Sequence, residues 1–439
     1  MLIGLIYLVY TYYPALNIIT GYASKNLASG LFLAGRDSIS FEEDDNGFFP
    51  VNLSSYTIDL KNKSVTASIF GLMKRKAVFV EGRGAVLLND RDQSPQDHDV
   101  PKRKIRNGLF SYPYGDLPQR DTIFEAVNYE MLERAVEDSF DDIGEKDKKT
   151  RSVLVVYKDH IISEKYVPGF DKNTVINGWS MTKSLTGTIY GVLAKKGLID
   201  INDRTGIEEW AGDDRKHITI DNLLHMNSGL AWDEAYFNIS DVTRMLYFDS
   251  DMGQSQIRNP LVGKPNELWN YASGTTNILS GPLMRKLFDN HQEYLDFWYT
   301  ELIDKIGMHS AVVETDLKGN YIGSSYAWAT TRDWAKLGLL YLHQGNWHGE
   351  QVLDSSWVQY VRTPTNTSEG RYGAQFWLNA DGHFPDVPRN MFSCNGFQGQ
   401  YIFIFPDLEL VVVRTGLASE PSFDVNEFLK EILSSIQSD

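Results

Sequence analysis

The sequence predicts an α+β fold, in which an antiparallel sheet is flanked by helices and carries a helical lobe. Pairs of short apolar strands stand at residues 152–166 and 401–413, on either side of a middle section of about 180 to 395 with helical patterning. Helices packed on such a sheet form one layered unit. With 439 residues, 42% of them apolar, the chain can bury a large core, and its single cysteine, Cys394, cannot close an intrachain disulfide.

The amino-terminal part predicts short strands after an uncharged start. Residues 1–24 carry no charged side chain, and their apolar run ends near Tyr10, well short of the roughly 20 residues of a membrane-spanning helix. We interpret Met1–Tyr10 as part of an export signal or membrane anchor, with a buried first strand or helix as the alternative. Strands are expected at residues 31–33, 56–60, 65–70 and 77–80.

The remaining elements complete the fold. A helix is expected from Thr122 to about Ser139, then a hairpin at residues 152–166, then strands at residues 401–405 and 408–413, and a last helix at residues 423–436. We therefore divide the chain into an extension of residues 1–120 and a main domain of residues 121–439.

Charge and composition exclude some classes of function. The chain has 42 Lys and Arg against 58 Asp and Glu, a net charge of −16. Nucleic-acid binding depends on Lys and Arg contacts to phosphates, so no nucleic-acid partner is expected. The sequence has no His-Glu-x-x-His motif, and we expect neither a metal site nor a cofactor.

The segment from Asn177 to Gly197 predicts one buried helix that opens at Ser180. Apolar residues recur every three or four positions along it. Ser180 and Lys183 lie three residues apart, on the same face of this helix. A serine hydroxyl is a weak nucleophile until a base accepts its proton, and a desolvated lysine can be that base. The simpler interpretation is a capping serine beside an exposed lysine, because Ser-x-x-Lys alone is a weak pattern.

Other serine-hydrolase arrangements fit less well. The segment Gly178–Thr182 lacks the second glycine of the Gly-x-Ser-x-Gly nucleophile elbow. A Ser-His-Asp triad stays open, because its members can be far apart in sequence.

With a second motif downstream, the sequence resembles the serine β-lactamase and penicillin-binding-protein superfamily. The resemblance is to its class C-like branch, with its esterases and aminohexanoate-oligomer hydrolases. Tyr271 and Ser273, in the segment Trp269–Leu279, resemble the Tyr-x-Asn motif of this branch. The segments 219–230 and 329–338 match the same branch. The resemblance implies a β-lactamase-like fold over residues 122–437 and makes Tyr271 the phenol that works with Lys183 in proton transfer.

The third motif of the family, Lys-Thr-Gly, has two candidates here. Arg414-Thr415-Gly416 resembles it literally but ends a strand, whereas the segment Phe397, Gln398 and Gly399 precedes one, as the family motif does. We favour the latter. The backbone N–H groups of Gln400 and Ser180 would then form the oxyanion hole, and Ser273, Phe397, Gln398 and Gly399 would bind substrate. Phe397 replaces the lysine that binds the β-lactam carboxylate in antibiotic-directed members.

These motifs predict a serine hydrolase that cleaves small esters or amides through an acyl-enzyme on Ser180. The alternatives are β-lactamase or D-alanyl peptidase activity, or a catalytically silent binding protein of the same fold. A periplasmic, secreted or membrane-anchored location is expected, with a cytoplasmic location as the alternative. The sequence does not predict an oligomeric state.

Overall fold

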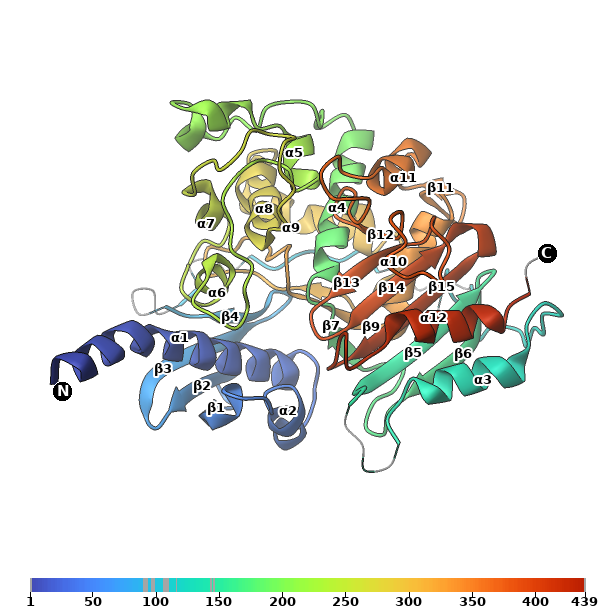
Figure 1. The fold of residues 1–439 in the computed structure, drawn as a ribbon, viewed down its shortest axis with the longest axis horizontal. Helices are drawn as coiled ribbons and strands as arrows, with labels where there is room; N and C mark the ends of the chain where they lie inside the picture. Colours follow the sequence, from blue (N-terminus) through green and yellow to red (C-terminus); the bar gives the residue numbers. More distant parts are fainter. Residues whose placement is uncertain are drawn as a thin grey trace.

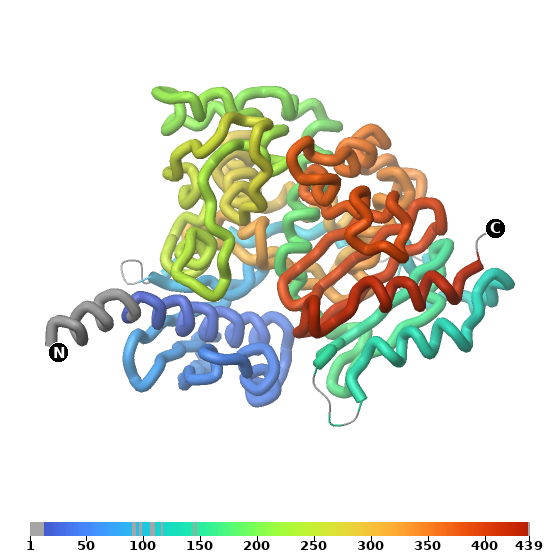
Figure 2. The backbone as a smooth tube through the Cα atoms, in the orientation of Figure 1, coloured from blue at the N-terminus to red at the C-terminus, as the bar shows by residue number. Residues whose placement is uncertain are grey.

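A computed structural model describes residues 2–89, 94–95, 99–105, 110–115, 117–142, 144 and 147–437, with side chains from residue 13 onward. The side chains of the predicted signal or anchor, Met1–Tyr10, lie outside the described residues. Figures 1 and 2 show the extension, in blue, below a lobe of helices and beside the domain that carries the main sheet.

The extension begins with one long helix, α1 (Leu2–Phe32). The predicted strand at residues 31–33 is therefore wrong: Phe32 is still helical, and Leu33 and Ala34 donate backbone hydrogen bonds to the carbonyl of Ser29 at the helix end. The apolar pattern there comes from a helix face, on which Leu27 and Ala28 are fully buried. In the described part of the chain, no helix is both long and apolar enough to cross a membrane.

The helix α1 packs on an antiparallel four-stranded sheet in the order β1-β2-β3-β4. Its buried side chains include Val65, Ala67 and Ala77. Three of its strands match predicted segments, and β4 was not predicted. The elements of the extension are α1, α2 (Ser38–Asp44), β1 (Ser54–Asp59), β2 (Ser64–Ile69), β3 (Leu72–Val80) and β4 (Gly84–Leu87).

A buried polar cluster joins the extension to the main domain. Lys25 of α1 donates to Glu314 Oε2 at 2.7 Å and to the carbonyl of Ala85 at 2.6 Å. The other carboxylate oxygen of Glu314 accepts from Ser29 Oγ and from the backbone N–H of Ala85, both at 2.7 Å. Three segments of the chain thus meet at one carboxylate. The division of the chain near residue 120 stays a prediction.

The main domain is built on an antiparallel six-stranded sheet in the order β12-β13-β14-β15-β5-β6. Both faces of this sheet are covered, so its central strands are apolar at nearly every position. In β5, Leu154 and Val156 face one core, while Val153 and Val155 face the other. The strands are β5 (Thr150–Tyr157), β6 (His160–Tyr166), β12 (Trp377–Leu378), β13 (Phe392–Gly396), β14 (Gln400–Phe405) and β15 (Leu410–Gly416).

Helices on the two faces complete the layers. The helices α3 (Tyr129–Asp138) and α12 (Val425–Ser434) cover one face, and α4 (Met181–Lys195) and α10 (Thr331–Leu342) pack on the other. The first predicted helix starts later than expected, because the side chain of Asn128 caps it by accepting from the N–H of Met131 at 3.1 Å. The α+β class and the hairpin between β5 and β6 are confirmed.

The lobe consists of short helices between α4 and α10, as the middle section predicted. A second small sheet, in the order β7-β9-β8, borders it. The α-helices and strands of this region are β7 (Val175–Asn177), α5 (Ile220–Leu224), α6 (Asp241–Tyr247), α7 (Gln254–Ile257), α8 (Ser273–Ile278), α9 (His291–Trp298), β8 (Val312–Val313), β9 (Ala327–Thr330), β10 (Asn346–Trp347), β11 (Glu350–Gln351) and α11 (Ser355–Arg362).

Candidate active site

The helix α4 places Ser180 at the point where β7 ends and the helix begins. The residue before it, Trp179, has a left-handed backbone with φ of 47°, a conformation that bulky residues seldom adopt and that is enriched at functional sites. Its N–H donates to the side chain of Asn177 at 3.0 Å. From Met181 to Leu193 every residue of the helix is buried. Ser180 is therefore held on a rigid element, as predicted.

Lys183 lies directly behind Ser180. It is 1% exposed, and its ammonium group donates to Ser180 Oγ at 2.9 Å, to Ser273 Oγ at 3.0 Å and to the carbonyl of Ser324 at 2.9 Å. Burial lowers its pKa to about 8, and the charge of Glu234 opposes that shift. Lys183 is thus not the exposed lysine of the simpler interpretation, and a sizeable fraction of it is neutral near pH 8.

Tyr271 lies beside the same pair. Its ring centroid is 4.8 Å from the Lys183 ammonium. Burial and the charge of Glu234 raise the pKa of the phenol, and a hydrogen bond with Ser180 lowers it. The shift is upward on balance, so Tyr271 is a neutral phenol and can donate a proton. The structure thus brings together Ser180, Lys183 and Tyr271, which the sequence separates by up to 91 residues.

Ser273, expected to bind substrate, lies in the hydrogen-bond network around Lys183. It is fully buried, accepts from Lys183, and donates to Glu234 Oε1 at 2.5 Å, while its backbone N–H donates to Glu234 Oε2 at 2.9 Å. Through these contacts Ser273 connects Lys183 with Glu234. The substrate-binding role expected of Ser273 stays a prediction.

Glu234 is a candidate site residue that sequence reasoning missed. Its carboxylate accepts from the Ser273 hydroxyl and backbone, from Tyr236 OH at 2.7 Å and from Trp232 Nε1. Glu234 stands in the lobe, 39 positions before Ser273 in the chain, and no local motif marks it. The carbonyl of Ser324 was also missed, because a backbone group leaves no trace in the residue type.

The segment Phe397–Gly399 forms the turn between β13 and β14. A Cβ atom added to Gly396 would lie 2.1 Å from the carbonyl oxygen of Gly178, so the end of β13 is in close contact with the turn before Ser180. Gln400 is the first residue of β14, as predicted, and its side chain is hydrogen-bonded to both the N–H and the carbonyl of Gly416. The oxyanion role of the backbone N–H groups of Ser180 and Gln400 stays a prediction.

The rival third motif, Arg414-Thr415-Gly416, supports that turn from behind. Arg414 is fully buried at the end of β15. It donates at 2.7 Å to the carbonyl of Gly399 and at 2.7 Å to that of Ala418. Its guanidinium group therefore stabilises the Phe397–Gly399 turn.

Phe397 is part of an aromatic wall. Its ring packs edge to face on Trp179, with centroids 5.5 Å apart, and stacks on Tyr236 at 5.4 Å. An aromatic ring therefore occupies the position at which the resemblance implies a cation.

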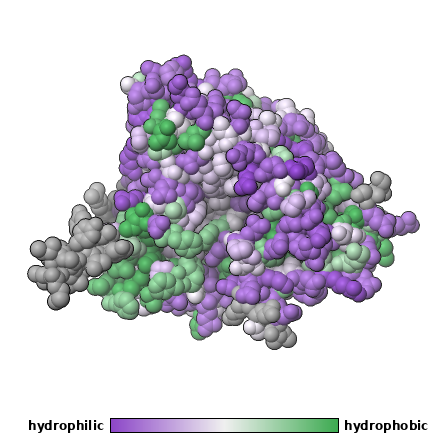
Figure 3. Space-filling view, in the orientation of Figure 1, coloured by the Kyte–Doolittle hydropathy of each residue, from purple (hydrophilic) through white to green (hydrophobic). Residues whose placement is uncertain are grey.

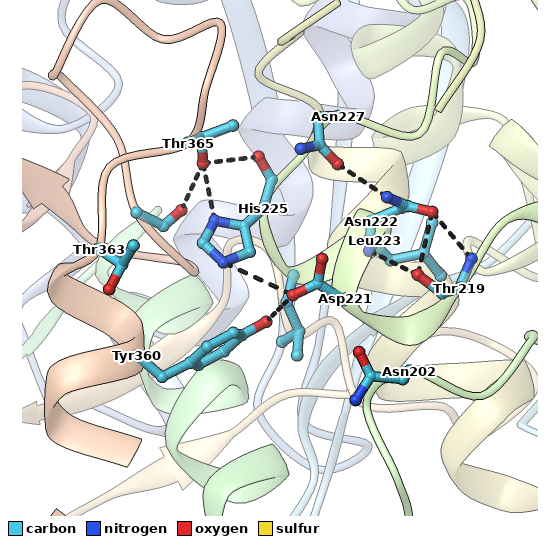
Figure 4. A network of polar contacts seen from close by, with 12 residues as sticks. Asn202, Thr219, Asp221, Asn222, Leu223, His225, Asn227, Tyr360, Thr363 and Thr365 are labelled. Atoms are coloured by element: carbon cyan, nitrogen blue, oxygen red, sulfur yellow. Dashed lines mark hydrogen bonds and ion pairs between the residues drawn. The ribbon is translucent and has the colours of Figure 1, made fainter. Parts of the chain in front are cut away.

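The segment 219–230 forms a separate polar network, shown in Figure 4. His225 Nδ1 lies 2.7 Å from Thr365 Oγ1, and Tyr360 OH donates to Asp221 at 2.7 Å. A hydroxyl, a histidine and an aspartate thus meet, but Thr365 is only 3% exposed and Ser180 is not among the partners. The network stabilises the loop after α5, and burial lowers the pKa of His225.

These features define a hydrolase-type site on an α+β fold, and comparison with known proteins identifies its family. The model of the family described as Beta-lactamase matches residues 136–426. The 6-aminohexanoate-dimer hydrolase of Paenarthrobacter ureafaciens is 23% identical over 308 residues, which cover 64% of this chain and 75% of that protein. The chain belongs to the beta-lactamase family, and it is a serine hydrolase of that family.

Solved structures agree on the fold. A family VIII carboxylesterase superposes with a TM-score of 0.52 at 15% identity, covering 72% of this chain and 98% of that one. A D-stereospecific amidohydrolase from Streptomyces sp. gives a TM-score of 0.52 at 14% identity, covering 69% of this chain and 98% of that one. The predicted β-lactamase-like fold is confirmed.

Proposed function

We propose that this protein hydrolyses carboxylic esters or amides through an acyl-enzyme on Ser180. The observation that carries the proposal is the buried Lys183 ammonium, 2.9 Å from Ser180 Oγ and with a pKa near 8. A base whose pKa is close to the pH at which the enzyme operates is suited to general acid–base catalysis. The ester and amide substrates are supported by the carboxylesterase and amidohydrolase neighbours and by the aminohexanoate-dimer hydrolase relative.

Acylation begins when neutral Lys183 accepts the proton of Ser180 and Oγ attacks the substrate carbonyl. The backbone N–H groups of Ser180 and Gln400 stabilise the oxyanion. When the tetrahedral intermediate collapses, the Tyr271 phenol gives its proton to the leaving alcohol or amine. Lys183 then returns its proton to Tyr271, so the acyl-enzyme forms with both groups in their starting states.

Deacylation repeats these steps with water. Lys183, acting with Tyr271, accepts a proton from the water, the resulting hydroxide attacks the acyl carbonyl, and Ser180 leaves with that proton. Ser273 and Glu234 act as positioning residues. Ser273 holds the lysine, and the charge of Glu234 favours its protonated form.

The aromatic wall favours neutral substrates over β-lactams. Phe397, packed between Trp179 and Tyr236, offers no positive charge to a substrate carboxylate. We therefore expect p-nitrophenyl acetate, which has no carboxylate, to be hydrolysed faster than nitrocefin. Faster turnover of nitrocefin would favour the β-lactamase alternative.

The decisive test is Ser180→Ala. We expect loss of p-nitrophenyl acetate turnover by about 10⁴-fold or more, as for nucleophile removal in other serine hydrolases, and loss of labelling by a fluorophosphonate. Ser184→Ala, one turn further along α4, is the matched control, because the Ser184 hydroxyl donates to the carbonyl of Gln375. Retained turnover in Ser180→Ala would contradict the assignment, and an unlabelled wild-type protein would favour the silent binding protein.

A further inference from the structure

An apolar pocket lies between the extension and the catalytic centre. Its volume is about 380 Å³, within the range of about 300–1,000 Å³ typical of small-molecule sites. On the extension side it is lined by one face of α1 and by the loop before β1; on the other side it is lined by the segment before α6 and by the aromatic wall. Figure 3 shows hydrophobic residues gathered over the extension on this face of the molecule. We call this cavity the extension pocket.

The extension pocket shares its wall with the catalytic centre. Trp179 precedes Ser180 in the chain, Phe397 belongs to the third motif, and Tyr236 donates to Glu234, which holds Ser273. Tyr22 of α1 stacks on Trp179 with centroids 6.0 Å apart and planes inclined by 13°. The pocket lining therefore includes a chain neighbour of Ser180 and a residue of the third motif.

The α1 face of the pocket presents aliphatic side chains. Ala15, Ile18, Ile19 and Tyr22 line it, at spacings that put them on one face of the helix. The lining also includes Val51, Ile239 and the exposed ring of Phe237. The lining suits an uncharged, flexible chain, because few hydrogen-bonding groups face the cavity and each buried methylene contributes favourably.

A larger cleft of about 760 Å³ lies elsewhere, bordered by Arg120, Arg332 and Asp333, and contains none of the predicted catalytic residues. Its lining mixes charged side chains with apolar ones such as Ile123 and Ile161. The lining of neither cavity includes Ser180, Lys183 or Tyr271, but the extension pocket has the more apolar lining and includes Trp179, the residue before Ser180.

Resting on the proposed function, we propose that the extension pocket holds the unbranched alkyl chain of a substrate whose ester or amide carbonyl lies at Ser180. The substrates are then medium-chain acyl or alkyl compounds, and the extension is a specificity element. The chain can belong to the acyl group or to the leaving alcohol, and the experiment distinguishes the two.

The test is a chain-length series on the full-length protein. One arm uses p-nitrophenyl acetate, butyrate, hexanoate and octanoate, and the other uses ethyl, butyl, hexyl and octyl acetates. We expect kcat/KM to rise by about fourfold per buried methylene in one arm. A flat profile in both arms, with p-nitrophenyl acetate still hydrolysed, would overturn the pocket assignment while leaving the proposed function intact.

Two substitutions fill the pocket from the extension side. Ile18→Trp and Ala15→Trp should each reduce the octyl-to-short-chain ratio of kcat/KM by at least about tenfold. Tyr13→Trp is the matched control, because Tyr13 is on the same helix, 42% exposed and outside the lining. It should keep the wild-type ratio, and equal ratios in all four proteins would contradict the proposal.

A binding measurement separates the pocket from catalysis. Calorimetric titration of 1-octanol into Ser180→Ala should show binding that Ile18→Trp, added to it, abolishes. Should no ester or amide be hydrolysed, octanol binding would still support the pocket while the proposed function fails. Absence of octanol binding to Ser180→Ala would count against the pocket itself.

Discussion

The extension and the main domain each bury one lysine, and the two lysines have different surroundings. Lys25 and Lys183 are both 1% exposed. Lys25 contacts a carboxylate, Glu314, at 2.7 Å, whereas the hydrogen-bond partners of Lys183 are two hydroxyl oxygens and a carbonyl. Burial lowers the pKa of both. Glu314 opposes that shift at Lys25 through its charge and a direct hydrogen bond, whereas Glu234 opposes it at Lys183 through its charge alone.

This difference separates a structural lysine from a candidate catalytic one. A buried ammonium paired with a carboxylate keeps its proton and joins elements. A buried ammonium among neutral oxygens can lose its proton near neutral pH and act as a base. One buried lysine, Lys25, thus joins the extension to the main domain, and the other, Lys183, is placed for proton transfer.

The largest effect is expected at Lys183. Lys183→Met should lower kcat/KM for p-nitrophenyl acetate by about 10³-fold, within the range for general-base removal, with little loss of folded protein. Lys195→Met, at the exposed end of the same helix, should have no effect. Stopped-flow and steady-state assays measure both, and near-normal activity in Lys183→Met would remove its role as base.

At Lys25 the effect should be on stability. Lys25→Met leaves the carboxylate of Glu314 buried without its cation, and breaking such a pair costs about 3–5 kcal/mol. Denaturant unfolding followed by circular dichroism measures the loss. Adding Glu314→Gln should restore part of it, and a loss below about 1 kcal/mol would show that the pair does not hold the extension.

The pH dependence of kcat/KM tests the role of Lys183 without mutation. Because the base must be neutral, kcat/KM should rise with pH through the pKa of Lys183 at about 8, falling by about tenfold per unit below it. A profile flat from pH 6 to 9 would contradict this assignment.

Removing the charge of Glu234 tests the same pH dependence of kcat/KM. Glu234 raises the pKa of Lys183, so Glu234→Gln should move the rise in kcat/KM to lower pH. A role of Glu234 in packing alone would change the height of the profile and leave its midpoint in place.

The smallest effect is expected at Tyr236. Tyr236→Phe removes the hydrogen bond of 2.7 Å to Glu234 but keeps the ring that stacks on Phe397. One such bond contributes about 1 kcal/mol, so kcat should fall by about fivefold. A loss near that of Lys183→Met would instead place Tyr236 in the proton transfer.

The sequence predicted those features of the structure that depend on residues close together in the chain. The spacing of Ser180 and Lys183 on one helix, the hairpin of β5 and β6, and the turn of Phe397–Gly399 before β14 follow from residue type and position over a few residues. The strand expected at residues 31–33 failed for the same reason, since a short apolar run fits a strand or a helix face equally well.

The sequence by itself determined the α+β class, the family resemblance and the order of Ser180, Lys183 and Tyr271. Only the tertiary structure decided what surrounds Lys183: the Ser324 carbonyl is 141 positions away in the chain, and Ser273 is 90. It also decided that Glu234 is hydrogen-bonded to Ser273 and that α1 borders the aromatic wall. The physical reason is that desolvation and hydrogen bonding depend on neighbours in space, and these neighbours come from segments without a shared sequence pattern.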